Sequence, residues 1–129
     1  MARLGLFTSE KKRTVQFDAD TEVLIKHIDK EALSEISRKA GKAARLSGGD
    51  AKEIFNQRLG RAAVLGWRKI GDHNHPGLIV DDQPFAFTEA NLDLLMKKSL
   101  EFSAFVNEEA TDSVSFLDEE KESAVIKNG

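Results

Sequence analysis

The short segment Asp72-His73-Asn74-His75 holds the residue types of this sequence that are best suited to chemistry. Two imidazoles two positions apart, with Asp81 and Asp82 nearby, could bind a metal ion or hold a catalytic base. A zinc site needs three or four ligands at settled spacing, yet His27 is the only other histidine and the sequence has no cysteine. Because Pro76-Gly77 follows and is typical of a turn, we interpret the segment as a polar loop. A metal-dependent hydrolase stays open as an alternative.

Other patterns that carry catalysis are missing from the sequence. It has no Gly-x-Ser-x-Gly nucleophile turn, no Gly-x-x-x-x-Gly-Lys-Ser/Thr phosphate loop and no Gly-x-Gly-x-x-Gly dinucleotide motif. Ser47-Gly48-Gly49 is better explained as a turn between two helices. None of the many carboxylates has the apolar sequence context that would tune an acid or base. We therefore expect a protein that is not an enzyme and that binds no cofactor or metal.

The charged residues are unevenly distributed, although the formal net charge is only −3. Residues 30–69 carry ten basic and four acidic side chains, a net charge of +6, whereas residues 70–129 carry four basic and thirteen acidic ones, a net charge of −9. The basic segment is consistent with a nucleic-acid-binding regulator, or with a polarised subunit that associates with copies of itself. A pI near 5.6 argues against duplex binding, so we do not expect a nucleic-acid partner.

Periodicity and turn residues predict the elements that must position these side chains. Residues 1–13 are expected to form a flexible arm. Residues 14–17 and 22–28 are β-prone and flank the turn signal Asp18-Ala19-Asp20, which predicts a β-hairpin near the N-terminus. Apolar residues at helical spacing predict four helices, each after a residue that makes a good N-cap: Asp29, Asp50, Thr88 and Ser99.

The first two helices are expected to form an antiparallel pair, with the second ending near Gly66-Trp67. Short strands or an irregular loop should follow and bury Trp67. The predicted fold is α+β and mostly helical, a single domain over residues 14–117 with four to five helices and the small hairpin. Residues 118–129 are acidic and polar, which predicts a disordered tail.

Six apolar residues are candidates for contact with a partner protein. Three lie in the arm and three near the end of the chain: Leu4, Leu6, Phe7, Phe102, Phe105 and Phe116. At helical spacing the default position of the phenylalanines is the core, so they serve either packing or binding.

Length and composition limit the cellular setting. The 129 residues suit one domain that can bury a core, and the absence of cysteine fits a reducing compartment. No apolar run approaches the roughly 20 residues of a membrane span, and the N-terminus turns polar at Thr8, too early for a signal peptide. We expect a cytoplasmic protein that does not contact a membrane.

The order of several segments resembles the tail assembly chaperone family of long-tailed bacteriophages. Thr21-Glu22-Val23 resembles the family's opening segment, and Gly66-Trp67-Arg68-Lys69-Ile70 resembles its central Gly-Trp-x-x-Ile/Val step. Residues 84–91, followed by Leu94-Leu95, resemble the family's Pro-Phe-Thr-x-Glu-Asn start of a helix, and Phe105-Val106 fits the same layout. The resemblance spans roughly residues 14–129.

The resemblance implies a non-catalytic protein of the bacterial host cytoplasm, made by a phage or prophage. It would bind the tape measure protein, keep its apolar helical stretches soluble during tail morphogenesis, and associate with itself into a homo-oligomer. The family provides no catalytic residues to carry over. The alternatives are a small structural tail or connector component of the phage particle, and a nucleic-acid-binding regulator that uses the basic helices of residues 30–69.

Overall fold

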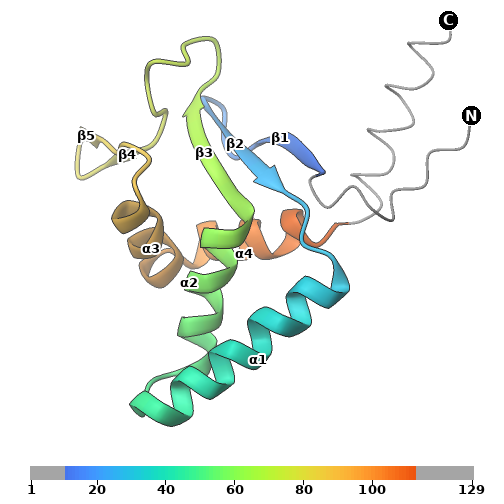
Figure 1. The fold of residues 1–129 in the computed structure, drawn as a ribbon. Helices are drawn as coiled ribbons and strands as arrows, with labels where there is room; N and C mark the ends of the chain where they lie inside the picture. Colours follow the sequence, from blue (N-terminus) through green and yellow to red (C-terminus); the bar gives the residue numbers. More distant parts are fainter. Residues whose placement is uncertain (1–10, 113–129) are drawn as a thin grey trace, which may run out of the picture.

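A computed structural model describes residues 11–112 and shows a small antiparallel sheet packed against helices (Figure 1). The sheet has the order β1-β2-β3, with β1 at Lys12–Gln16, β2 at Thr21–Lys26 and β3 at Val64–Lys69. Every second residue of β2 is buried, as expected of a central strand with one face against the core. The predicted hairpin is therefore confirmed, and Asp18 closes its turn by accepting hydrogen bonds from the backbone of Asp20 and Thr21.

Four helices follow the caps that the sequence indicates. They are α1 at Lys30–Ser47, α2 at Ala51–Ala63, α3 at Glu89–Lys98 and α4 at Leu100–Ala110. The side chain of each predicted N-cap accepts a hydrogen bond from the first turn of its helix. Gly48, with φ of 72°, ends α1 in the left-handed conformation that glycine adopts without strain. The fold class is α+β and mostly helical, as predicted.

The end of α2 differs from the prediction. The helix stops at Ala63, and Gly66 and Trp67 lie within β3 rather than at a helix end. Trp67 pairs with Val23 of β2 and is buried, so the pairing of β3 with β2 outweighs the helical spacing of the preceding residues. The third strand therefore begins at Val64, within the region expected to be the end of the helix, and it buries Trp67 as predicted.

The helices lie at one end of the sheet, and α1 lies farthest from it (Figure 1). The core is formed mainly by β2, β3, α2, α3 and α4, and the ring of Phe102 is among its largest fully buried side chains. That ring lies 5.5 Å from Phe17 and 5.8 Å from Trp67, both in edge-on geometry. In α1, by contrast, Ala40 is the single buried residue.

The domain limits can be compared with the structure only in part. Lys12 and Arg13, which the sequence assigned to the arm, already belong to β1. Lys11 is also described, and its carbonyl oxygen accepts from the backbone N–H of His27 at 2.7 Å. Arm residues 1–10 and the predicted tail over 118–129 lie outside the described residues. Within residues 11–112, no helix has both the length and the apolar character needed to cross a membrane.

Candidate partner-binding groove

An open groove of about 410 Å³ lies where α3 meets α4, beside a second, two-stranded sheet. That sheet pairs β4 (Ile79–Val80) with β5 (Gln83–Pro84). We call this opening the apolar groove. Apolar side chains make up most of its lining, which consists of Phe17, Leu78, Ile79, Val80, Phe85, Leu94, Leu95, Lys98, Ser99, Glu101 and Phe102.

The rim of the apolar groove exposes large hydrophobic side chains to solvent. Ile79 is 55% exposed and Leu94 is 45% exposed, and they come from opposite walls, the small sheet and α3. Lys98 and Glu101 add one charge of each sign to the same lining. Adjacent exposed apolar residues with a polar rim are typical of a surface that binds another molecule.

The wall formed by β4 and β5 is held by its turn and by Trp67. Asp81 and Asp82 both have positive φ, 51° and 64°, which is the type I′ geometry that suits a two-residue hairpin turn. The indole nitrogen of Trp67 donates to the carbonyl oxygen of Phe85 at 2.7 Å, and the two rings stack 6.2 Å apart. The wall is therefore attached directly to the main sheet.

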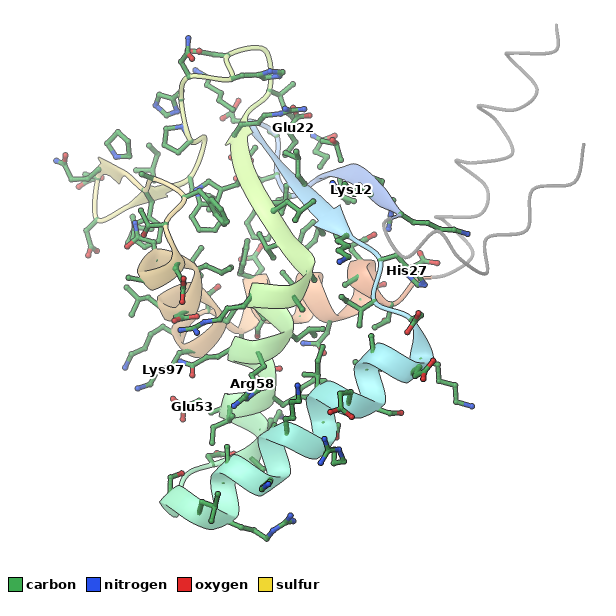
Figure 2. The ribbon with its side chains drawn as sticks, viewed as in Figure 1. Lys12, Glu22, His27, Glu53, Arg58 and Lys97 are labelled. Carbon is green, nitrogen blue, oxygen red and sulfur yellow. The ribbon has the colours of Figure 1, made fainter. Side chains whose placement is uncertain are left out.

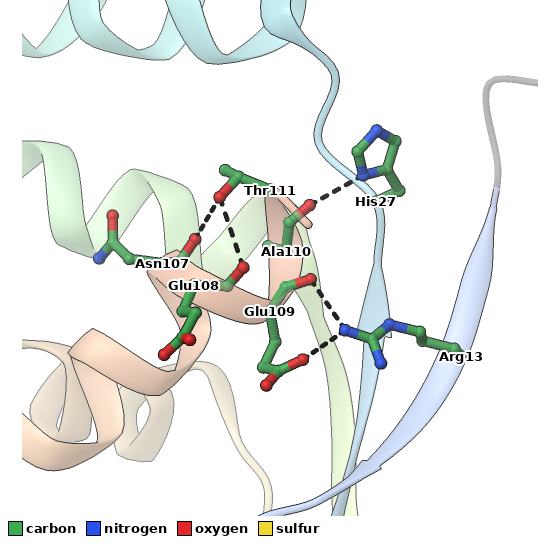
Figure 3. A network of polar contacts seen from close by, with 7 residues as sticks. All are labelled: Arg13, His27, Asn107, Glu108, Glu109, Ala110 and Thr111. Atoms are coloured by element: carbon green, nitrogen blue, oxygen red, sulfur yellow. Dashed lines mark hydrogen bonds and ion pairs between the residues drawn. The ribbon is translucent and has the colours of Figure 1, made fainter. Parts of the chain in front are cut away.

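The wall formed by α4 is fixed at the far end of that helix (Figure 3). The carbonyl oxygen of Ala110 accepts from the backbone N–H of Ile28 at 2.9 Å and lies 3.0 Å from Nδ1 of His27. Because a carbonyl only accepts, this contact requires the proton on Nδ1. Arg13 forms an ion pair with Glu109 and donates to its carbonyl oxygen as well. Cationic and donor groups at a helix C-terminus complement its dipole, and here they connect α4 to β1 and to the segment that follows β2.

Two of the six predicted partner-binding residues lie in the described part of the chain. Phe102 forms part of the floor of the apolar groove but is only 1% exposed, so it is a core residue rather than part of an exposed stripe. Phe105 is partly buried, with its ring 5.0 Å from that of Phe17. The other four, Leu4, Leu6, Phe7 and Phe116, lie outside the described residues.

Sequence reasoning missed the exposed residues of the groove. Leu94 and Ile79 were not among the candidates, because a lone apolar residue on a surface needs no explanation. The adjacent pair Leu94-Leu95 carried a usable signal. Neighbouring residues on a helix are 100° apart, so two leucines in a row on a narrow helix extend the apolar face beyond the core.

The two histidines of residues 72–75 have structural contacts. Nδ1 of His75 accepts from the backbone N–H of Gly77 at 2.9 Å, which fits the predicted turn. Nε2 of His73 lies 3.6 Å from the carboxylate of Glu22, which also accepts from Arg68. In the part of the chain that the structure describes, no three histidine, aspartate or glutamate side chains are grouped as a metal site would need.

Acidic residues from other elements neutralise part of the basic segment. Arg61 of α2 donates to Asp93 of α3 at 2.9 Å and lies 3.1 Å from Glu89. Arg68 of β3 binds Glu22 of β2 at 2.6 Å. These pairs reduce the positive field that binding to a phosphate backbone would need.

Fold and groove together define a small, mostly helical α+β domain with an open apolar groove rather than an enclosed pocket. Over residues 12–127 the chain matches the model of a family described as YdaY prophage protein, and it belongs to that family. No curated protein and no solved structure matches it.

Proposed function

We propose that this prophage protein is a tail assembly chaperone that binds the tape measure protein and keeps it soluble during tail morphogenesis. The observation that carries the proposal is the apolar groove, which exposes Ile79 and Leu94 above a floor of core residues. An amphipathic helix recognises such a groove by apolar anchors at i, i+3, i+4 and i+7. The proposed function of the protein is non-catalytic and is carried out in the host cytoplasm.

Two further observations support the proposal. Membership of a prophage family fits a phage component, of which a tail chaperone is one kind. The segments that resemble tail chaperones also lie around the groove. Trp67 supports its β4–β5 wall, Phe85 lines that wall, and Thr88 caps α3, which forms the opposite wall.

The geometry suits temporary rather than permanent binding. The groove is open and its rim is mixed in charge, so a helix can enter sideways and leave again without the protein unfolding. A burial of about 1.5–3 kcal/mol for each large apolar side chain gives moderate affinity from two or three anchors. A chaperone that must release its client needs affinity in this range.

The test is co-expression with the tape measure protein of the same prophage, with soluble tape measure protein as the readout. The wild-type chain should raise the soluble fraction, and Leu94→Glu should abolish most of that gain because it places a charge at the rim of the groove. Leu46→Glu is the matched control, since Leu46 is also a helical leucine, is 80% exposed and lies at the end of α1 away from the groove.

A direct measurement uses Trp67, the only tryptophan in the chain. Its ring contacts Phe85 and Phe102, which both line the groove, so its fluorescence should change when a helical tape measure fragment binds. Leu94→Glu should weaken the fragment's affinity by roughly tenfold or more, and Leu46→Glu should not. Equal solubility of the tape measure protein with and without the chain would contradict the proposal. Finding the chain as a stable part of finished particles would favour the alternative of a structural tail component.

A further inference from the structure

A second groove, of about 530 Å³, lies between α1 and α2. We call it the basic groove. Its floor is apolar, and its rim carries three cations, so that the lining consists of Ile36, Lys39, Ile54, Gln57, Arg58, Arg61 and Ala62. A groove of this kind suits a segment in which apolar side chains stand next to carboxylates.

The cations of the basic groove are not equally engaged within the domain. Arg61 is held by Asp93 and Glu89, and Lys39 lies 3.8 Å from Glu35. Arg58 is exposed on α2 where this helix faces α1 (Figure 2), and among residues 11–112 its side chain makes no hydrogen bond or ion pair. Arg58 thus presents positive charge that acidic groups of the described domain do not cancel, while Lys39 shares Glu35 with Arg38.

We propose that the basic groove receives the segment Phe116-Leu117-Asp118-Glu119-Glu120 of a second copy of this chain. Two large apolar residues stand directly beside three carboxylates in this segment, and this order matches an apolar floor with a cationic rim. Residues 30–69 carry a net charge of +6 and residues 70–129 a net charge of −9, so the contact also joins oppositely charged parts of two copies.

The occupant comes from a second copy because of where the segment begins. Thr111, at the end of α4, lines a different groove together with Phe55 and Asn56, on a side of α2 turned away from Arg58 and Arg61. The chain from residue 112 to residue 116 spans at most about 14 Å. Half a turn around a helix about 10–12 Å in diameter is longer than this, and we therefore assign the segment to the groove of a second copy.

A contact between two different surfaces makes the association head-to-tail. Each copy offers one groove and one acidic segment, so copies add in a ring or an open chain, or two copies exchange their segments reciprocally in a dimer. The contact combines an apolar floor with exposed charges at the rim, and salt weakens the charged part. It does not involve the apolar groove, and it is independent of the tape measure proposal.

The experiment measures the mass of the full chain by sedimentation velocity across protein concentration, at roughly 0.03 M and 0.5 M salt. At low salt and about 100 µM protein the wild-type mass should exceed the 14.3 kDa monomer at least twofold, and at high salt it should fall toward the monomer. Lys39→Glu/Arg58→Glu and Glu119→Lys/Glu120→Lys should each remain monomeric at low salt.

A mixture of the two double variants provides the decisive test. An equal mixture of the two double variants should associate again, because the acidic groove of one accepts the basic segment of the other. Lys30→Glu/Lys69→Glu is the matched control, since it makes the same change in net charge at exposed residues outside the groove and should associate like the wild type. Circular dichroism checks that each variant is folded.

Several outcomes overturn the proposal. A monomeric wild type at low salt does so, and so does association that survives Lys39→Glu/Arg58→Glu. A mixture of the two variants that stays monomeric also contradicts it. Association that disappears after nuclease treatment would assign the basic groove to nucleic acid instead.

Discussion

The two grooves are similar in size but differ in what lies behind them. The floor of the apolar groove is the core itself, because Phe102 and Leu78 belong to both. The basic groove has α1 as one wall, and α1 packs chiefly on α2 and buries only Ala40. The apolar groove is therefore coupled to folding, whereas the basic groove can be changed on α1 at little cost to the fold.

This difference shows how each groove can be studied. Substitutions in the floor of the apolar groove change stability and binding together. Substitutions at its rim are expected to change binding while the stability of the fold stays the same. The exposed cations of the basic groove can be reversed without disturbing the core.

The largest effect is expected for Phe102→Ala. Removal of a buried ring that contacts Phe17 and Trp67 should lower the free energy of unfolding by about 3–5 kcal/mol. Leu46→Ala on α1 should change it by no more than about 0.5 kcal/mol, because this side chain is 80% exposed. Urea denaturation followed by Trp67 fluorescence and circular dichroism measures both. A loss at Leu46 comparable to that at Phe102 would show that α1 is part of the core.

Smaller effects on the free energy of unfolding are expected when alanine replaces glycine in a helix. The two glycines Gly60 and Gly41 should respond with opposite signs. A Cβ at Gly60 of α2 would lie 2.6 Å from Cγ of Met96, because α2 and α3 approach closely there. Gly60→Ala should destabilise the protein, since overpacking costs about 1–3 kcal/mol and offsets a gain in helix propensity of about 1 kcal/mol. A Cβ at Gly41 of α1 would meet only Arg45, at an ordinary 3.8 Å.

Gly41→Ala should therefore raise the free energy of unfolding by roughly 0.5–1 kcal/mol. The midpoint of urea denaturation measures both variants under the same conditions. The comparison fails if both glycines respond with the same sign, because the close approach at Met96 would then have no energetic effect.

The helices could be predicted from the sequence because their signals are local. Asp29, Asp50, Thr88 and Ser99 each bond to the backbone two or three residues ahead, so neighbours in the sequence decide where a helix begins. The hairpin turn at Asp18 is local in the same way. The starts of the four helices and the position of the hairpin turn therefore follow from the local sequence.

The start of the third strand, its pairing with β2 and the grooves could not be predicted, because they depend on residues far apart in the sequence. Trp67 pairs with Val23 of β2, which lies 44 positions earlier in the sequence. The apolar groove joins Phe17, Ile79 and Leu94, and the basic groove joins Ile36 and Arg61. Charge distribution identified the basic segment, but only the fold shows which of its cations are neutralised.

The smallest effect is expected for a change in the titration of Glu35 on α1. The hydrogen bond from Arg38, together with the positive charges of Arg38 and Lys39, lowers the pKa of this carboxyl group. A carboxyl group with a lowered pKa in the folded state stabilises that state above its unfolded pKa, and this contribution is lost as the pH falls through the folded value. Carbon-detected NMR of the Glu35 carboxyl should give a midpoint below the ordinary glutamate value, and Arg38→Gln should raise it. Lys42→Gln is the matched control and should leave the midpoint unchanged, because Lys42 makes no contact with Glu35 in the described structure. An equal rise in both variants would mean that the general charge of α1, rather than the contact with Arg38, lowers the pKa.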